Sequence, residues 1–361
     1  MTFDDFYRDS AIGEKIIRDI FSVATRQWRI MEICGGQTHA LLRSGIDQRL
    51  TDVITLIHGP GCPVCVTSPS VVDSAISLAR DSSVILCSFG DMIRVPGNHM
   101  TLREARALGG AVEVVYSPLD ALNIARKYPD KEVVFFGIGF ETTAPTVALA
   151  ILIASSEQLN NFSVLSSHLL VPPALIEILS SADSGIDGIL AAGHVCAVMG
   201  YRDYGPISEK FRIPIVVTGF EPVDLLLGIY RCIVQLESGD SKVENQYKRV
   251  VVADGNKSAK DALLKVFEID STSWRGFGSI EASGLKIRPQ FGKYDAFERF
   301  TLPRDADELP CNCISGAILR GTRTPLECPA FGKSCTLDHP LGATMVSEEG
   351  ACSAYMLYKM G

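Results

Sequence analysis

The sequence predicts an α/β fold with two parallel-sheet domains, helices on both faces of each sheet, and a cysteine-rich C-terminal domain. From about residue 27 to residue 238, apolar runs of strand length alternate with helical stretches, an order typical of a parallel sheet covered by helices. The 361 residues exceed what one hydrophobic core normally holds. The predicted domains are 27–130, 131–238 and 239–361, with an N-terminal helix in 1–26 packed on the last of them.

Composition narrows the possible partners. A net charge of −8 and an isoelectric point near 5.4 argue against a nucleic-acid or anionic-membrane binder, because nothing supplies an overall attraction to phosphate. The longest apolar stretch, 146–154, is too short to span a bilayer and predicts a buried helix. The acidic N-terminus has no secretory signal pattern, so a cytoplasmic protein is expected. Eleven cysteines there are expected to be ligands and redox thiols, because the cytosol keeps thiols reduced.

Two strands of the first domain end in cysteine loops. Trp28–Ile33 leads into Cys34 and a helix start, where unsatisfied backbone N–H groups favour the thiolate. Val53–Ile57 leads into a Gly/Pro-rich loop with Cys62 and Cys65, which form a small disulfide or half of a zinc site. Open α/β sheets keep their chemistry at these carboxyl ends. The other expected strands are 84–88 and 112–116, and the helices are 70–80, 102–108 and 117–127.

The second domain repeats the tripeptide Gly-Phe-Glu after two strands. Its glutamates, Glu141 and Glu221, each precede a helix. At such a position the more ordinary role is capping of the helix N-terminus, here by Thr142, the residue after Glu141. His194 and Cys196 follow another strand, and a core-facing pair is favoured over a shared metal. The expected strands are 133–138, 163–167, 188–192 and 213–217, and the helices are 146–154, 173–180 and 223–234. Helices are also expected over 242–252 and 257–267, with a loop over 272–278.

The remaining thiols divide into core and ligand candidates. Cys87 lies inside a strand and Cys232 inside an apolar helix, so both are expected in the core. The tail has little periodicity, so a metal centre is expected to stabilise it. Zinc and a four-iron cluster are both compatible with its thiols; two close Cys-x-x-Cys knuckles are lacking, which favours iron–sulfur. The tail cysteines are Cys311, Cys313, Cys328, Cys335 and Cys352.

Ordered motifs along the whole chain resemble those of the HypD family, which matures nickel–iron hydrogenases. The motifs are Met31–His39 (Met-Glu-Ile-Cys-Gly-Gly-Gln-Thr-His), His58–Cys65 (His-Gly-Pro-Gly-Cys-Pro-Val-Cys), Phe89–Gly97, Gly139–Pro145 and the cysteine-rich tail. Where the family often has His after Cys-Gly-Gly, this chain has Gln37, which weakens an imidazole role there and leaves His39.

The resemblance implies an assembly scaffold for iron carrying cyanide and carbon monoxide. It implies that the chain acts together with the small chaperone HypC, that HypE delivers cyanide, and that the hydrogenase large subunit is an indirect partner. It implies iron binding by Cys34, a redox pair at Cys62 and Cys65, and site roles for His39 and Glu141. The family's 4Fe-4S cluster spacing, with fourteen, six and sixteen intervening residues, is met by Cys313, Cys328, Cys335 and Cys352.

The chemistry is consistent with a redox-active scaffold rather than a conventional turnover enzyme. Releasing cyanide from a thiocyanate takes two electrons, which a vicinal dithiol supplies by closing its disulfide. A cluster in the tail would then have to lie close to Cys62 and Cys65. Two alternatives remain open: a cytoplasmic thiol–disulfide oxidoreductase and a zinc-stabilised binding protein.

Overall fold

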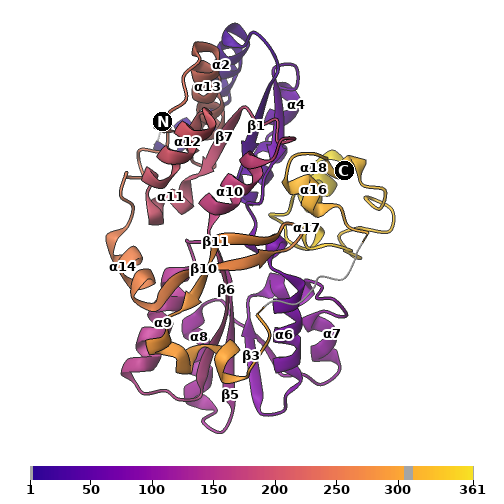
Figure 1. The fold of residues 1–361 in the computed structure, drawn as a ribbon. Coiled ribbons are helices and arrows are strands. Elements are labelled where there is room, and N and C mark those ends of the chain that lie inside the picture. Colours follow the sequence, from indigo (N-terminus) through magenta and orange to yellow (C-terminus); the bar gives the residue numbers. More distant parts are fainter. Residues whose placement is uncertain (1–2, 305–311, 361) are drawn as a thin grey trace.

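A computed structural model describes residues 3–304 and 312–360, which form two β-sheets and a C-terminal region (Figure 1). The first sheet, sheet A, has the strand order β2-β1-β7-β8-β9, and all its pairs are parallel. Its strands are β1 (Trp28–Glu32), β2 (Ile54–His58), β7 (Gly188–Ala192), β8 (Ile215–Thr218) and β9 (Val243–Asn245). Sheet A is therefore an open parallel sheet with β2 at one edge.

The second sheet, sheet B, has the order β10-β11-β6-β5-β3-β4. The strands from β6 to β4 are parallel, whereas the hairpin of β10 and β11 adds two antiparallel strands at one edge. The strands are β3 (Val84–Ser88), β4 (Val112–Val114), β5 (Glu132–Gly139), β6 (Phe162–Leu169), β10 (Phe267–Trp274) and β11 (Gly278–Ile287). The α/β class with two mostly parallel sheets is confirmed.

Neither sheet is built from one continuous stretch of chain. The segment predicted as the first domain, 27–130, supplies β1 and β2 to sheet A and β3 and β4 to sheet B. The segment 131–238 supplies β5 and β6 to sheet B and β7 and β8 to sheet A. The boundary between the two sheets therefore does not coincide with the predicted domain boundary at residue 130. The alternation of strands and helices in the sequence predicts where the strands are, but it does not specify which strands pair.

Helices cover both faces of each sheet. Figure 1 shows α2, α4 and α13 against sheet A at the top, and α6, α7, α8 and α9 around sheet B at the bottom. The α-helices are α1 (Phe3–Arg8), α2 (Ser10–Val23), α3 (Gly35–Arg43), α4 (Ile46–Arg49), α5 (Pro63–Val66), α6 (Pro69–Arg80), α7 (Leu102–Ala107), α8 (Pro118–Lys127), α9 (Ala144–Ser156), α10 (Val171–Ser180), α11 (Gly193–Met199), α12 (Gly205–Phe211), α13 (Pro222–Ser238), α14 (Lys257–Val266), α15 (Ala296–Arg299), α16 (Ser315–Leu319), α17 (Ala343–Val346) and α18 (Ala351–Lys359). The 3-10 turns are η1 (Gly90–Arg94), η2 (Arg202–Tyr204), η3 (Pro289–Tyr294) and η4 (Pro325–Glu327).

The N-terminal segment packs mainly on α13 of sheet A, and Arg249, which falls within the predicted range 239–361, lies over the Tyr7 ring. The expected single helix is two helices, because the Asp9 carboxylate accepts from the N–H groups of Ala11 and Ile12 and so begins α2. The apolar face of α2, with Ile16 and Ile20, packs in one core with α13. Burial of this apolar surface stabilises α2 against α13.

Two expectations for the region after residue 238 are wrong in detail. The predicted helix over 242–252 is instead β9 followed by turns, because Val243 pairs with Ile215 of β8 and extends sheet A. The predicted loop over 272–278 contains the end of β10, with Trp274 fully buried. Tertiary pairing overrides local propensity at both places.

The C-terminal region lies beside sheet A at the edge that carries β2, shown in yellow in Figure 1. Helix α18 packs on α3, and α17 packs on the short helix α5. The cysteine-rich tail is thereby placed against the loops that follow β1 and β2. Among the described residues, no helix is long and apolar enough to cross a membrane.

The difference in burial between two aromatic residues near sheet B predicts how strongly their loss changes stability. Phe135 of β5 is fully buried under α8 and α9, so Phe135→Ala should lower the free energy of unfolding by about 3–5 kcal/mol. Tyr116→Ala is the matched control, because this ring is 92% exposed and its loss should change stability by less than about 0.5 kcal/mol. Urea denaturation followed by circular dichroism measures both. Equal midpoints for the two variants would contradict the assigned core.

Candidate functional site

Cys34 lies at the carboxyl end of sheet A between β1 and α3. Its residue surface is 3% exposed, and its Sγ is 3.8 Å from Nδ1 of His194, the second residue of α11. The ring of Phe220 packs beside His194, with 5.3 Å between ring centroids. Because β1, β7 and β8 are neighbours in the sheet, the segments that follow them converge on one thiol.

Burial dominates the electrostatics of the Cys34 thiol. Burial raises its pKa well above the ordinary value, and the Glu32 carboxylate raises it further. The backbone N–H groups of Gln37 and Gly36 lower the pKa, as expected at a helix start, but burial outweighs them. The thiol is therefore protonated in the protein alone, and a soft metal would have to displace its proton on binding.

The Cys62–Cys65 loop lies directly on the backbone of Cys34. A Cβ atom at Gly61 would overlap the backbone nitrogen and Cα of Cys34, so only glycine permits this approach. The N–H of Gly35 donates to the Gly61 carbonyl oxygen at 3.2 Å. Cys62 and Cys65 form a disulfide, and Pro63 begins the helical turn α5 between them. The structure thus brings the two predicted thiol sites of the first domain together.

The C-terminal region closes this site from the other side. A Cβ at Gly35 would overlap Glu349, which packs on the start of α3. The Sγ of Cys65 lies 3.8 Å from the carbonyl oxygen of Ala343. The preceding residue, Gly342, has no room for a Cβ because Cys313 Sγ occupies that place. Gly342 and Ala343 therefore lie between the disulfide and Cys313. Cys313 is the first member of the tail quartet, which is Cys313, Cys328, Cys335 and Cys352.

The four tail cysteines predicted as cluster ligands line one small apolar cavity. They are Cys313, Cys328, Cys335 and Cys352. Leu341 N–H donates to Cys335 Sγ and Thr344 Oγ1 donates to Cys352 Sγ, each at 3.3 Å. Burial raises the pKa of Cys352 to about 12, and the other three thiols add to that effect.

This donor set fits an iron–sulfur centre, because soft thiols line one apolar pocket, and a backbone N–H and a hydroxyl donate to two of the sulfurs. Within the described part of the chain, no three or more His, Cys, Asp or Glu side chains gather closely enough for a single metal ion. Cys311, expected as an extra thiol, lies outside the described residues.

His39 is placed against the C-terminal helix. Its Nε2 is 2.7 Å from the Tyr358 hydroxyl of α18, and burial lowers its pKa. His58, the last residue of β2, makes its contact with Glu32 at 2.8 Å from Nδ1. His39 therefore connects α3 to α18 through Tyr358, whereas His58 contacts Glu32, the residue that also binds the backbone N–H of Cys34.

Glu141 is a buried acid in the loop between β5 and α9. Its Oε1 accepts from the Val171 N–H at 2.9 Å, and its Oε2 has no hydrogen-bond partner among the described residues. Burial raises the pKa of this carboxyl to about 7. The cap position of α9 is Thr143, whose side chain makes no capping bond, so the expected capping by Thr142 does not occur.

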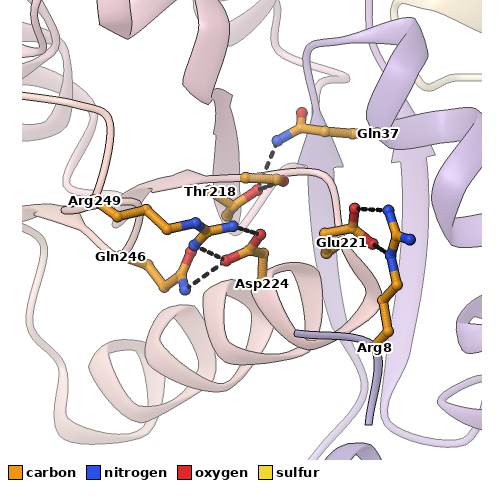
Figure 2. A network of polar contacts seen from close by, with 8 residues as sticks. Arg8, Gln37, Thr218, Glu221, Asp224, Gln246 and Arg249 are labelled. Carbon is orange, nitrogen blue, oxygen red and sulfur yellow. Dashed lines mark hydrogen bonds and ion pairs between the residues drawn. The ribbon is translucent and has the colours of Figure 1, made fainter. Parts of the chain in front are cut away.

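The second Gly-Phe-Glu segment takes part in a polar network at the end of β8 (Figure 2). Glu221 accepts two hydrogen bonds from Arg8, at 2.7 and 2.8 Å. Arg249 binds the buried Asp224 through both guanidinium branches. Gln37 donates to Thr218 Oγ1 at 2.8 Å, so this side chain ties α3 to β8.

Comparison with known proteins identifies the family. The family described as "HypD: Hydrogenase formation hypA family" matches residues 11–359. The chain belongs to the HypD family. The hydrogenase maturation factors HypD of Rhizobium leguminosarum bv. viciae and Rhodobacter capsulatus are each 44% identical over 370 residues, covering 99% of this chain and 96% and 98% of theirs. That of Escherichia coli K12 is 44% identical over 340 residues, 93% of this chain and 90% of its own.

The structure adds residues that sequence reasoning did not place at the site of this HypD-family chain. His194 and Phe220 cover the Cys34 thiol, and Glu32 lies beneath it. The position of His194 just after a strand is the signal that the sequence offers, but only the pairing of β7 with β1 brings this side chain to Cys34.

The approach of Gly61 to Cys34 predicts a steric test. Gly61→Ala forces the Cys62–Cys65 loop away from Cys34 and should lower the free energy of unfolding by about 2–4 kcal/mol. Gly36→Ala is the control, because its Cβ would meet the Phe220 ring at an ordinary 3.5 Å. Thermal unfolding of both variants measures the effect. A Gly61→Ala protein as stable as Gly36→Ala would refute the contact.

Glu141 predicts a pH dependence of stability. The folded state holds its proton up to a pKa of about 7, whereas the unfolded carboxyl loses it near the ordinary 4.5. Stability therefore falls as pH rises through this window, by about 3 kcal/mol in total. Glu141→Gln keeps the acceptor for Val171 and removes the titration. The free energy of unfolding is measured by urea denaturation at about pH 4 and about pH 8. Between these two pH values the stability of Glu141→Gln relative to wild type should rise by about 3 kcal/mol. An unchanged difference would contradict the buried neutral acid.

Proposed function

We propose that this chain is a scaffold on which iron receives cyanide and carbon monoxide ligands for the nickel–iron hydrogenase active site, acting together with HypC. The observation that carries the proposal is the adjacency of three sulfur groups: Cys34, the Cys62–Cys65 disulfide and the tail quartet. Membership of a hydrogenase maturation family supports it.

Cys34 is the proposed iron ligand. Iron carrying cyanide and carbon monoxide is electron-rich and suits a soft thiolate donor. Burial under His194 and Phe220 keeps water away from the thiol, which would protect bound cyanide and carbon monoxide from exchange. Because burial favours the protonated thiol, loading of iron is coupled to release of that proton.

Cys62 and Cys65 are the proposed electron source for cyanide transfer. A thiocyanate R–S–C≡N on HypE and two thiols yield R–SH, cyanide on iron, one disulfide and one proton, which balances atoms and electrons. The S–CN bond breaks, the S–S bond forms, and the two cysteine sulfurs are oxidised. The Cys62–Cys65 disulfide supports this proposal, because the step would leave the pair in that oxidised form.

Reopening the disulfide requires a reductant. A 4Fe-4S cluster held by Cys313, Cys328, Cys335 and Cys352 would supply electrons one at a time when bound. A short path for these electrons would run from Cys313 through Gly342 and Ala343 to Cys65. Cys313 Sγ lies against Gly342, and the Ala343 carbonyl oxygen is 3.8 Å from Cys65 Sγ.

We further propose a cytoplasmic location and an assembly role instead of conventional turnover. Of the two alternatives left open by the sequence, the disulfide favours a general thiol–disulfide oxidoreductase over a zinc-stabilised binding protein. Such an enzyme would reduce a generic disulfide substrate without HypC. A scaffold should form a stable complex with HypC and show little activity alone. Anaerobic co-purification with HypC, followed by infrared spectroscopy for cyanide and carbonyl stretches, separates the two: absence of both stretches from an intact complex would refute the scaffold.

If Cys62 and Cys65 supply the electrons, their substitution should remove cyanide from iron and leave the cluster intact. Cys62→Ala and Cys65→Ala should leave the visible absorption of the tail cluster unchanged but abolish the cyanide stretch on iron, because each removes one of the two thiols that supply the electrons. Cys87→Ala, a buried core cysteine under α8 and α9, is the control and should keep both signals. If both redox-pair variants still matured hydrogenase, the dithiol role would be wrong.

A further inference from the structure

A buried polar cluster next to Cys34, formed by Glu32 and His58, is not used by the proposed chemistry. The Glu32 side chain is fully buried at the end of β1 and His58 is 5% exposed at the end of β2. In the sheet these two residues are direct neighbours. The cluster therefore joins the last residue of β1 to the last residue of β2, below the two loops that carry Cys34 and the disulfide.

The Glu32 carboxylate accepts from three donors. Oε2 accepts from the backbone N–H of Cys34 at 2.9 Å. Oε1 lies 2.8 Å from His58 Nδ1 and also accepts a short hydrogen bond from the hydroxyl of Thr38 in α3. With Glu32 accepting at both of its oxygens, Nδ1 is the donating nitrogen of His58. One buried carboxylate thus fixes the residue before α3, the first turn of α3 and the histidine ring.

His58 is held from its other side by the C-terminal region. Its ring packs edge-on against Tyr355 of α18, with 5.4 Å between centroids. Nε2 has no hydrogen-bond partner within the described part of the chain, so the ring is oriented by Glu32 and Tyr355. Tyr355 is three residues from Cys352 on the same helix, so the contact connects the wall of the tail cavity to the base of Cys34.

We propose that Glu32 and His58 are positioning residues that hold the Cys34 thiol in its buried place against the disulfide loop. Without the Cys34 N–H bond, the start of α3 is held to Glu32 by the Thr38 hydroxyl alone, and the Cys34 thiol becomes more accessible to solvent. Removing His58 leaves the buried Glu32 side chain without one of its three hydrogen-bond donors, which makes local opening easier. The importance of this for iron rests on the proposed function, whereas the positioning itself does not.

Cysteine reactivity tests the pair without iron or any partner. The full chain, with Cys62–Cys65 kept as the disulfide, is treated with iodoacetamide, and alkylation of Cys34 is followed by peptide mass spectrometry. His58→Leu removes the donor to Glu32 and should speed Cys34 alkylation by about tenfold or more, equivalent to about 1.4 kcal/mol of opening free energy. His58→Asn places an amide N–H where Nδ1 stood and should stay within about twofold of wild type.

Two further measurements separate positioning from general loosening. Cys232, fully buried in α13, should remain unlabelled in every variant. Glu32→Leu, which removes both side-chain oxygens, should raise Cys34 alkylation at least as much as His58→Leu, and the double variant should go no further than Glu32→Leu, because His58 acts through Glu32. The proposal is overturned if His58→Leu and Glu32→Leu label Cys34 at the wild-type rate, if Cys232 labels in parallel, or if His58→Asn fails to restore protection. None of these outcomes depends on whether Cys34 binds iron.

Discussion

The backbone of Gly61 lies against the backbone of Cys34, and the rest of the site depends on this contact. Neighbouring parallel strands, β1 and β2, deliver the two loops to the same edge of sheet A, and the absence of a side chain at Gly61 lets them touch. Glycine is required for a packing reason here, since a Cβ would overlap Cys34. The thiol and the disulfide are therefore adjacent through backbone packing, and their spacing does not rely on flexible side chains.

The other sulfur group reaches this edge because the C-terminal region packs on α3 and α5. Gly342 and Ala343 fill the space between Cys313 and Cys65, and Glu349 closes over the start of α3. A tail with few regular elements would be poorly stabilised by its own core, but here it gains contacts with sheet A and surrounds a pocket of thiols. Metal binding in that pocket would strengthen the same contacts that enclose Cys34.

Sequence reasoning reached the α/β class, the cysteine loops at strand ends and, through family resemblance, the four tail cysteines that line one cavity. It could not give the interleaving of the sheets, because alternation of strands and helices does not encode which strands pair. It therefore missed His194, which only the pairing of β7 with β1 brings to Cys34. It also expected a thiolate from the helix start, whereas burial, a tertiary property, controls the Cys34 thiol.

We propose that electrons pass from a 4Fe-4S cluster held by the four tail cysteines to the adjacent Cys62–Cys65 disulfide. Anaerobic reduction of the reconstituted protein with dithionite, followed by counting free thiols at Cys62 and Cys65, tests this transfer. Both thiols should appear in the wild-type protein, whereas Cys335→Ser, which lacks a cluster ligand, should keep the disulfide. Equal opening of the disulfide in the two proteins, or a disulfide that persists in wild type after the cluster is reduced, would contradict it.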